Sequence, residues 1–429
     1  MTDLSVVEIC AGAGGQSLGL HLAGFHHKLA VELDPTAAET LKTNLDRLAL
    51  AAGSKRATVA VGDVADGNVW SPEQFDGVSL LAGGVPCPPF TIAGKQLGSD
   101  DERDLFAWAV ESVGRVRPAA VMLENVRGLW MPRFAAYRQA VLDRLNELGY
   151  VAEWRLLEAR HYGVPQLRPR TILVALLPEF APYFRWPEPE LSTETVGTAL
   201  RDLMAERGWR GVNRWVKKAN DIAPTIVGGS KKHGGADLGP TRARRAWAEL
   251  GVNGISLADE APGRELSAAY VPRLTTEMVA RLQGWHGSED YAWEFTGRKT
   301  SRYRQIGNAF PPPVARAVGT AIASALRKEH IMKDSTDAKV THSPVYGLLR
   351  ANPNRFVPVG ELLAQLADVR TADQVTRDIT FLRRDFDLDE QVQGGQLAYR
   401  LGGWRAFQGE AEHARHVAFN SGKGRARIS

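Results

Sequence analysis

A proline- and glycine-rich segment contains the residue best suited to nucleophilic chemistry in this chain. Residues 83–95 read GGVPCPPFTIAGK, and Cys87 within them is one of only two cysteines among 429 residues. Because Pro86 precedes this cysteine and two prolines follow it, the segment forms neither a helix nor a central strand and holds the thiol in a stiff loop. The loop follows an apolar, β-prone run at 75–81, and ligands of open α/β sheets bind where strands end. This position favours a nucleophile over a packing role for Cys87.

A second candidate site combines a glycine loop with two carboxylates. Residues 10–15 read CAGAGG between a predicted strand and a predicted helix, and glycines there let a ligand approach the backbone and the free N–H groups of the helix. Glu32 ends the next predicted strand, where a carboxylate can accept both hydroxyls of a ribose. Asp63 ends a third strand and could accept from an adenine amino group. Singly, each carboxylate fits a solvated loop residue or a helix cap better, but the three positions together favour an adenosyl ligand.

Further polar residues follow the same pattern. Glu124 lies at the end of the apolar run VMLENV, and residues 166–170 read QLRPR just before the strand-like run TILVALL. Alone, Glu124 fits a cap and the arginines fit ordinary surface charge. Their expected position at strand ends, on the same edge as Cys87, favours a functional role.

The elements that must position these residues form an α/β pattern. From residue 4 to about 177, short β-like runs alternate with helical ones, with strand-like runs near 5–10, 27–33, 78–84, 119–125 and 171–177. This alternation predicts βαβ units on a mostly parallel sheet. After Pro178 the chain is irregular and rich in glycine, arginine and tryptophan to about 291. An Ala/Val-rich helix over 313–328 is expected to pack back on the first part.

Length and composition limit the classes of protein that fit. A chain of 429 residues with 44% hydrophobic residues indicates two or three domains with ample core. Two cysteines make no disulfide framework and fit a reducing compartment. No run has the length of a membrane span, and the N-terminus has no signal-peptide pattern. The net charge of +4 permits nucleic acid as a partner without demanding it.

Taken in order, these blocks resemble those of the DNA (cytosine-5) methyltransferases. The resemblance runs from Val6 to about Ala315 and includes CAGAGG, the Pro-Cys loop, ENV at 124–126, QLRPR, RLTTEMVARLQGW from 273 and RQIGNAFPPPVA from 304. It implies a Rossmann-like S-adenosylmethionine-dependent methyltransferase sheet with an inserted target-recognition domain, acting on double-stranded DNA. Two positions depart from the family pattern. Cys10 stands where the family usually has an aromatic residue against the adenine, and Pro88 stands where it usually has Gln.

The resemblance also implies roles for individual residues. Cys87 would add to C6 of cytosine and so activate C5, and Glu124 would donate a hydrogen bond or proton at N3. Arg168 would hold the base and the loop, with Arg170 as a second support, and the target base would be flipped out of the duplex. The base that removes the C5 proton is not identified, and a water can serve. The implied cofactor contacts are Cys10, Ala11, Gly12, Gly14, Gly15, Glu32, Asp63, Val64, Pro86, Leu105, Asn308 and Ala309.

The irregular middle region carries basic segments suited to DNA. Lys217 and Lys218, KKHGG from 231 and TRARRAW from 241 are interleaved with three tryptophans. We expect Trp209, Trp215 and Trp247 to form a small core and the segments from 231 and 241 to contact DNA, with solvated surface charge as the alternative. The DNA-binding candidates are Lys231, Lys232, His233, Arg242, Arg244 and Arg245, together with Arg377 further along the chain.

The C-terminal part resembles a winged helix-turn-helix. Helices are expected over 345–352, 357–366 and 371–386, with Thr371 as an N-cap of the third, followed by a hairpin that turns at 394–395. The third helix takes the recognition position. DNA binding is the preferred interpretation, because a second contact raises the local concentration of a DNA enzyme. A docking module for a partner protein is the alternative.

These patterns divide the chain into a catalytic domain (1–186), a target-recognition domain (187–272), a closing part of the catalytic domain (273–328), a linker (329–342), a winged-helix-like domain (343–404) and a disordered tail (405–429). We expect a cytoplasmic, nucleoid-associated enzyme that is monomeric on DNA, uses S-adenosylmethionine, needs no metal and contacts no membrane. It would belong to a restriction–modification system, whose other member would be a cognate restriction endonuclease. The alternatives are a tRNA cytosine-5 methyltransferase and a DNA-binding regulator that uses the winged helix.

Overall fold

The computed structural model describes residues 4–85, 103–190, 194–229, 235–285, 288–332 and 342–404. Predictions for Pro86, Cys87, Pro88, Lys231, Lys232, His233, most of the linker and the tail 405–429 lie outside the described residues.

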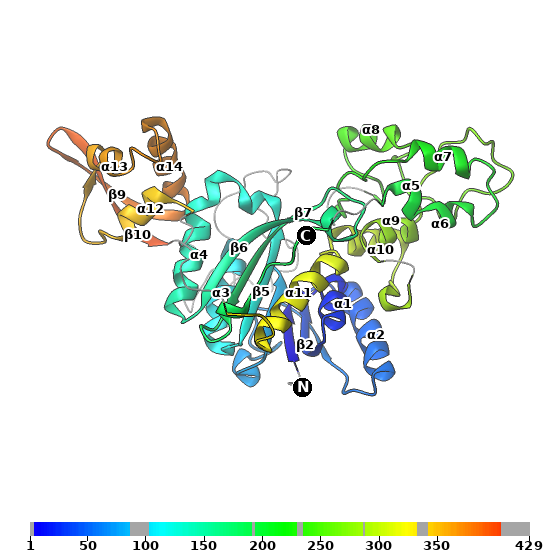
Figure 1. The fold of residues 1–429 in the computed structure, drawn as a ribbon, viewed down its shortest axis with the longest axis horizontal. Coiled ribbons are helices and arrows are strands. Elements are labelled where there is room, and N and C mark those ends of the chain that lie inside the picture. The colour runs from blue at the N-terminus through cyan, green and yellow to red at the C-terminus, as the bar shows by residue number, and fades with distance from the viewer. Residues whose placement is uncertain are drawn as a thin grey trace.

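A seven-stranded sheet of order β3-β2-β1-β4-β5-β7-β6 forms the centre of the protein (Figure 1). Only β7 runs against its neighbours, pairing antiparallel with both β5 and β6. The predicted mostly parallel α/β sheet is therefore confirmed. Its strands are β1 (Leu4–Ile9), β2 (Phe25–Glu32), β3 (Thr58–Val61), β4 (Leu80–Gly84), β5 (Ala120–Val126), β6 (Val151–Glu158) and β7 (Pro169–Leu176).

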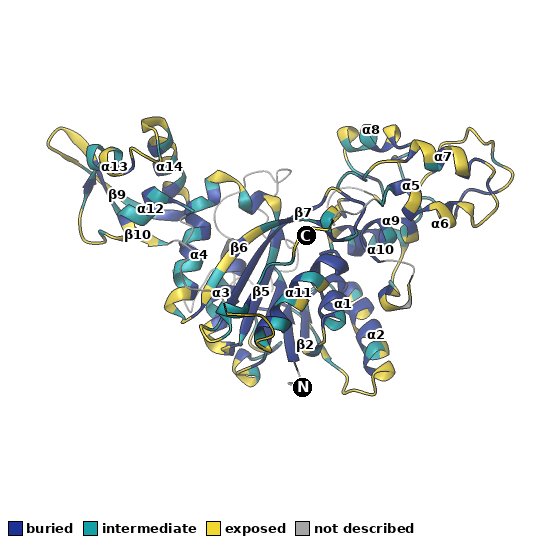
Figure 2. Ribbon diagram, in the orientation of Figure 1, coloured by how far each residue is buried: buried dark blue, intermediate teal, exposed yellow. Residues whose placement is uncertain are grey.

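The central strands are apolar because helices cover both faces of the sheet. Helices α3 (Arg103–Val116) and α4 (Ala135–Glu147) pack on one face, and α1 (Gly15–Leu22) and α11 (Pro312–Leu326) pack on the other. Figure 2 shows the resulting layer of buried strands between helices with exposed outer faces. Helices α1 and α11 lie so close that a Cβ added at Gly19 would overlap Ala315. Helix α2 (Pro35–Ala51) packs beside β2 and β3.

Strand β6 was not among the strand-like runs of the sequence. It is an edge strand whose exposed and more buried residues alternate, unlike the continuously buried β1. An edge strand with one solvated face carries polar residues such as Glu153 and Arg155. These polar residues make its sequence similar to that of a surface helix, so the strand is not recognised from the sequence.

The insert (residues 187–272) contains α5 (Val196–Ala199), α6 (Arg201–Ala205), α7 (Val212–Lys218) and α8 (Thr241–Glu249). Together with α9 (Thr276–Leu282) and α10 (Lys299–Asn308) it shares one hydrophobic cluster. Trp209, Trp215 and Trp247 are 3%, 4% and 0% exposed and belong to that cluster. The expectation that the three tryptophans form a core is confirmed.

The C-terminal lobe (residues 342–404) contains three helices and a three-stranded sheet. The expected helices and hairpin are confirmed, with Thr371 capping the third helix and Gly394 and Gly395 turning the hairpin in the left-handed region. A two-residue strand that pairs with the second hairpin strand was not expected. The elements of the C-terminal lobe are α12 (Pro344–Arg350), β8 (Val357–Pro358), α13 (Val359–Gln365), α14 (Ala372–Asp385), β9 (Phe386–Gln393) and β10 (Gln396–Trp404).

The C-terminal lobe packs directly on helix α4. Ala136 and Ala140 of α4 belong to the hydrophobic cluster of the lobe, and the Trp404 ring meets the Tyr137 ring edge-on at 5.1 Å. Arg350 also donates to Glu147 at 2.5 Å. Figure 1 shows the insert and the lobe at opposite ends of the sheet. Among the residues that the structure describes, no helix is long and apolar enough to cross a membrane.

Candidate active site

The glycine loop between β1 and α1 is fixed to the end of β2. The backbone N–H of Gly12 donates to Glu32 Oε2 at 2.7 Å, and that of Asp34 donates to Glu32 Oε1 at 2.8 Å. Gly12, Gly14 and also Cys10 have positive φ angles of 58°, 94° and 50°, a region that costs energy for a residue with a side chain. The loop is therefore held in a bent conformation at the N-terminus of α1, and its residues are buried or half-buried.

The Glu32 carboxylate is the acidic group closest to this loop along the sheet edge. Burial raises its pKa, and the N–H groups of Asp34 and Gly12 act in the opposite direction because they stabilise the anion. The two carboxylate oxygens offer about four acceptor sites in all, and the backbone N–H groups of Gly12, Asp34 and Leu33 interact with them. The carboxylate can therefore still accept from a ligand hydroxyl.

Asp63, Val64 and Leu105 line the neighbouring part of the sheet edge. Asp63 is buried after β3, and its Oδ1 accepts from the Ala65 N–H at 2.9 Å. Val64 and Leu105 belong to one hydrophobic cluster, and Cys10 packs against it. These contacts bring the predicted adenosyl-binding residues to one apolar wall with an acidic edge.

A buried amide at the start of α1 supports a polar ligand at this site. Gln16 directly follows the glycine loop and is buried, and neither its Oε1 nor its Nε2 has a hydrogen-bond partner among the described residues. Buried polar groups are rarely left unpaired. The orphaned amide, the loop backbone at the helix N-terminus and the acidic edge together fit a nucleoside with polar substituents. Among the described residues, no group of three or more potential metal ligands was found.

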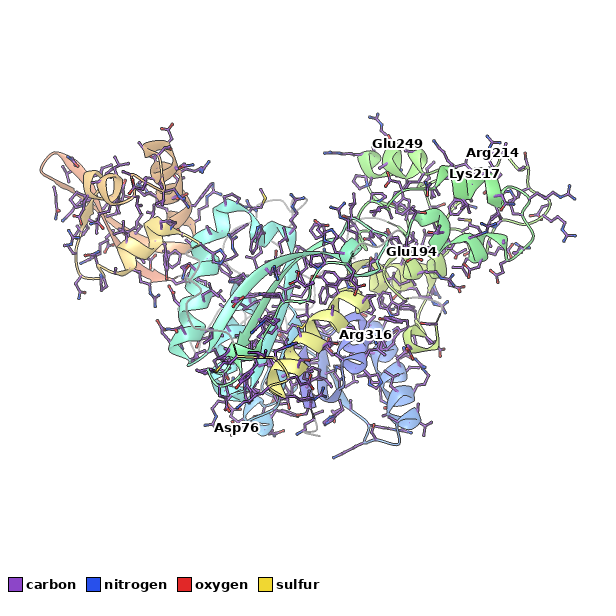
Figure 3. The ribbon with its side chains drawn as sticks, in the orientation of Figure 1. Asp76, Glu194, Arg214, Lys217, Glu249 and Arg316 are labelled. Carbon is purple, nitrogen blue, oxygen red and sulfur yellow. The ribbon has the colours of Figure 1, made fainter. Side chains whose placement is uncertain are left out.

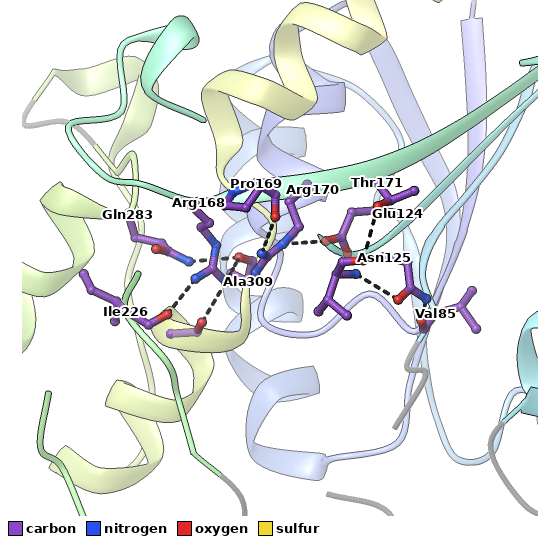
Figure 4. Close-up of polar contacts among 12 residues, drawn as sticks. Val85, Glu124, Asn125, Arg168, Pro169, Arg170, Thr171, Ile226, Gln283 and Ala309 are labelled. Atoms are coloured by element: carbon purple, nitrogen blue, oxygen red, sulfur yellow. Dashed lines mark hydrogen bonds and ion pairs between the residues drawn. The ribbon is translucent and has the colours of Figure 1, made fainter. Parts of the chain in front are cut away.

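The carboxyl end of β5 carries the second part of the site. Arg170 Nε lies 2.7 Å from Glu124 Oε1, and both side chains are almost fully buried (Figure 4). Burial raises the pKa of Glu124, while Arg170 and Arg168 act to lower it. A carboxyl whose pKa is raised can hold a proton and donate it.

Arg168 lies at the junction of three distant chain segments. Its guanidinium donates to the backbone oxygens of Ile226 and Gly307 at 2.7 Å each and of Ala309 at 2.9 Å. The residue is only 1% exposed. Arg170 pairs with Glu124, whereas Arg168, just before β7, ties this part of the chain to the insert and to the end of α10. The expected role of Arg168 in holding the base and the loop stays a prediction.

Two glutamines extend this junction, and the sequence analysis did not single them out. Gln166 Nε2 donates to Gln283 Oε1 at 2.7 Å, and Gln283 Nε2 donates to the Ala309 oxygen at 2.9 Å. Gln166 Oε1 in turn accepts from the Ile226 N–H. Gln166 and Gln283 lie in the motif blocks QLRPR and RLQGW. The sequence therefore contains both residues within its motifs, but their hydrogen bonds to each other and to Ala309 are formed only in the folded protein.

Asn125 connects the Glu124 strand to the segment that leads to Cys87. Its Nδ2 donates to the Val85 oxygen at 3.0 Å, the last described residue before that segment (Figure 4). Asn125 is buried, and its neighbour Glu124 pairs across the sheet with Gly84 of β4. The chain therefore enters the cysteine segment beside Glu124. Cys87 itself and Pro86 lie outside the described residues.

The remaining described residues of the predicted set lie in three places: the end of α10, helix α8 and helix α14. Asn308 is exposed and Ala309 half-buried at the end of α10, beside the glycine-rich turn at Gly228. Arg242 and Arg245 are exposed on α8, Arg244 is half-buried there, and Arg377 is exposed on α14 of the lobe.

Helix α7 carries Lys217 and Lys218 of the basic segments together with Arg214, which the sequence had not indicated. Arg214, Lys217 and Lys218 are exposed at i, i+3 and i+4, on the face opposite the buried Val212 and Trp215. Figure 3 shows Arg214 and Lys217 reaching outward from this helix. The i, i+3, i+4 spacing could have identified this stripe from the sequence.

Comparison with known proteins places the fold and the site in one family. Residues 4–324 match the model of the C-5 cytosine-specific DNA methylases, and the chain belongs to this family. It is 57% identical over 419 residues to the Type II methyltransferase M.NaeI of Lentzea aerocolonigenes, covering 98% of each chain. It is 47% identical to the Type II methyltransferase M.NgoMIV of Neisseria gonorrhoeae, covering 76% of this chain and 98% of that relative. A solved prophage-encoded protein of E. coli has the same fold, with 20% identity and a TM-score of 0.51 over 76% of this chain and 99% of that one.

Proposed function

We propose that this protein is the modification enzyme of a restriction–modification system. It transfers a methyl group from S-adenosylmethionine to C5 of a cytosine that is flipped out of a specific double-stranded DNA sequence. The observation that carries the proposal is the buried Glu124–Arg170 pair beside the entry to the Cys87 segment. The Type II methyltransferase relatives support DNA as the substrate over tRNA.

The chemistry follows from what cytosine lacks. Its C5 is a weak nucleophile, and addition of the Cys87 thiolate to C6 makes C5 electron-rich enough to attack a methyl group. Negative charge that develops on the ring is relieved when Glu124 donates its proton toward N3. Burial favours this role because it raises the pKa of Glu124 and keeps the carboxyl protonated to higher pH. Proton removal from C5 and elimination of Cys87 then release the product.

The cofactor site is proposed to lie at the glycine loop. The bound cofactor supplies an electrophilic methyl group. Glu32 would accept the ribose hydroxyls and Asp63 the adenine amino group, while Val64, Leu105 and Cys10 would pack against the base. The thiol at Cys10 replaces aromatic stacking with a softer contact.

The insert is proposed as the target-recognition domain. Arg242 and Arg245 on α8 and the stripe on α7 are exposed cations that pair with no carboxylate among the described residues. Free cations on adjoining helices suit phosphate contacts, which set the register of a protein on DNA. Arg168 links the backbone of this insert to the strand that carries Arg170. DNA held by the insert is thereby positioned relative to Glu124.

The C-terminal lobe is proposed as an auxiliary winged-helix-like module that contacts flanking DNA through α14 and Arg377. Residues 343–404 contain seven arginines, no lysine and eight acidic residues, and five of those arginines form ion pairs. Its phosphate contacts would therefore be few. M.NgoMIV matches only 76% of this chain, which indicates that about a quarter of it is not required by every such enzyme.

We further propose that the enzyme works as a monomer on DNA in the cytoplasm, associated with the nucleoid, alongside a cognate restriction endonuclease. Support for this setting is the family membership and the Type II relatives.

Bisulfite sequencing of DNA from cells that express the protein, with Cys87→Ser alongside, tests the proposal. We expect methylated cytosines in one short recurring sequence with the wild type and none with the variant. Equal methylation by both proteins would rule out Cys87 as the nucleophile. Absence of methylation in both would contradict the proposed DNA substrate and direct attention to RNA or to a regulatory role of the lobe.

A further inference from the structure

Residues 291–297, here called the strap, lie against the glycine loop that is proposed to bind the cofactor. The Trp293 indole Nε1–H donates to the backbone oxygen of Ala13 at 2.8 Å. A Cβ added at Gly14 would overlap the Trp293 ring, so the ring touches the loop backbone itself. The strap comes from a part of the chain 280 residues away from the loop.

The strap is anchored independently of the loop it touches. Asn44 of α2 donates to the Glu294 oxygen at 2.7 Å and accepts from the Glu294 N–H at 2.9 Å. Thr40 of the same helix accepts from the Thr296 N–H at 2.9 Å. Both α2 residues are fully buried. The position of Trp293 is therefore set by α2, which lies beside β2 and its terminal Glu32.

The Trp293 ring joins two hydrophobic clusters. It packs against the small cluster of Ala11 and Leu41 on the loop side, and against the cluster that the insert shares with α9 and α10. Within the described part of the chain, Leu48 of α2 is the one other partly buried residue that packs against both clusters. The indole thus couples the loop to the DNA-recognition side of the protein.

The glycine loop needs such external support. Gly12 and Gly14 have positive φ angles, and glycine loses more conformational freedom on ordering than any other residue. The Glu32 carboxylate accepts a hydrogen bond from the Gly12 N–H, and the Trp293 indole N–H donates one to the Ala13 carbonyl, directly before Gly14. Without the indole N–H the carbonyl can turn to water. The loop would then populate conformations unable to bind a ligand. The apparent affinity for the ligand falls in proportion to the fraction of molecules whose loop is in the binding conformation.

We propose that Trp293 is a positioning residue that holds the glycine loop in its cofactor-binding conformation without touching the reacting atoms. This inference rests on the proposed cofactor site. It predicts a specific defect: weaker binding of S-adenosylmethionine at unchanged chemistry.

The test is Trp293→Phe in the full-length protein, which keeps an aromatic ring and removes the N–H donor. A single hydrogen bond lost from a preorganised loop should raise the dissociation constant for S-adenosylmethionine roughly 3- to 10-fold in titration calorimetry. The KM for S-adenosylmethionine should rise by a similar factor, while kcat and the KM for DNA remain within about 2-fold of wild type.

Trp209→Phe is the matched control. The Trp209 indole donates to the Ser267 oxygen at 2.9 Å within the insert, so this variant loses the same kind of bond away from the loop. It should leave cofactor affinity unchanged. Wild-type affinity in Trp293→Phe would overturn the inference, as would equal losses in cofactor affinity, DNA affinity and thermal midpoint, because those indicate a merely structural role. If the wild type binds no S-adenosylmethionine, the proposed cofactor itself is wrong.

Discussion

Arg170 and Glu124 form an ion pair whose side chains are only 10% and 12% exposed, with Nε and Oε1 2.7 Å apart. The pair joins β7 to β5, two neighbouring strands of the sheet that run antiparallel to each other. Because burial raises the pKa of Glu124 and Arg170 opposes that rise, the arginine adjusts how readily the carboxyl gives up its proton. The pair therefore connects the architecture of the sheet to the proposed acid chemistry.

Glu124→Gln should abolish most of the methyl-transfer rate while leaving binding intact. Gln can donate a hydrogen bond toward N3 but cannot transfer a proton, and general acid catalysis contributes about 10²- to 10⁴-fold. Single-turnover methyl transfer to a DNA duplex measures the loss. Glu153→Gln is the control, because Glu153 lies on edge strand β6 and accepts from the Trp186 indole. A rate within about 3-fold of wild type for Glu124→Gln would refute the acid role.

Arg170→Gln should move the pH dependence of the reaction. Removing the cation raises the pKa of Glu124 further, since Arg170 is the first group acting to lower it. An acid catalyst is active while protonated, so the decline of kcat/KM on the alkaline side should shift to higher pH in the variant. The pH–rate profile of both proteins measures the shift. A decline at unchanged or lower pH would contradict the coupling between the two residues.

Arg168→Ala should unfold more easily than Arg170→Gln. The Arg168 guanidinium satisfies the buried carbonyls of Ile226 and Gly307, and each buried group left unpaired costs about 1–3 kcal/mol. The Ala309 oxygen would keep its bond from Gln283. We expect a loss of about 3 kcal/mol or more, measured from urea unfolding. A loss below about 1 kcal/mol would show that the junction is not a structural hub.

The sequence predicts the strand-end residues well because their chemistry depends on local patterns. Glu124, Glu32 and the glycine loop each follow an apolar run, and parallel strands bring such positions to one edge. The direction of β7 could not be read, since a continuously buried strand is apolar in either orientation. Edge strand β6 was missed because its alternating polar residues resemble a surface helix.

Contacts between distant segments could not be predicted in this way. Trp293 and Ala13 are 280 residues apart, and Arg168 and Gly307 are 139 apart. No periodicity or spacing within either segment encodes such a pairing. The different contacts of Arg168 and Arg170 have the same origin, because QLRPR presents two arginines two residues apart and only the packed fold determines that Arg170 pairs with Glu124.

The attachment of the C-terminal lobe should weaken at mildly acidic pH. Burial, and then the charge of Arg138, lower the pKa of His342 to about 4, while an unfolded histidine titrates near its ordinary value of about 6.5. The unfolded state therefore binds more protons between these values, so stability falls as the pH drops through that window. We expect about 1 to 2 kcal/mol to be lost between pH 7 and pH 5.

Thermal unfolding of the full chain at both pH values, with His342→Asn alongside, measures this effect. Asparagine keeps a polar side chain of smaller size but does not titrate, so the variant should lose less stability over the same range. The His342 ring lies edge-on against Trp130 at 6.0 Å, and the backbone N–H of His342 donates to Gln139 Oε1 of α4 at 3.0 Å. An identical pH response in both proteins would mean that another group titrates at the junction.

The stripe on α7 should contribute to DNA affinity through phosphates alone. Arg214 and Lys217 are exposed and unpaired among the described residues, and each phosphate contact contributes about 0.9 to the slope of log affinity against log salt. Arg214→Ala with Lys217→Ala should therefore reduce that slope by about 2 and weaken specific and nonspecific duplexes alike. Arg355→Ala is the control, because Arg355 is paired with Glu361 on the C-terminal lobe. Loss of sequence discrimination, rather than of salt dependence, would instead assign the stripe to base recognition.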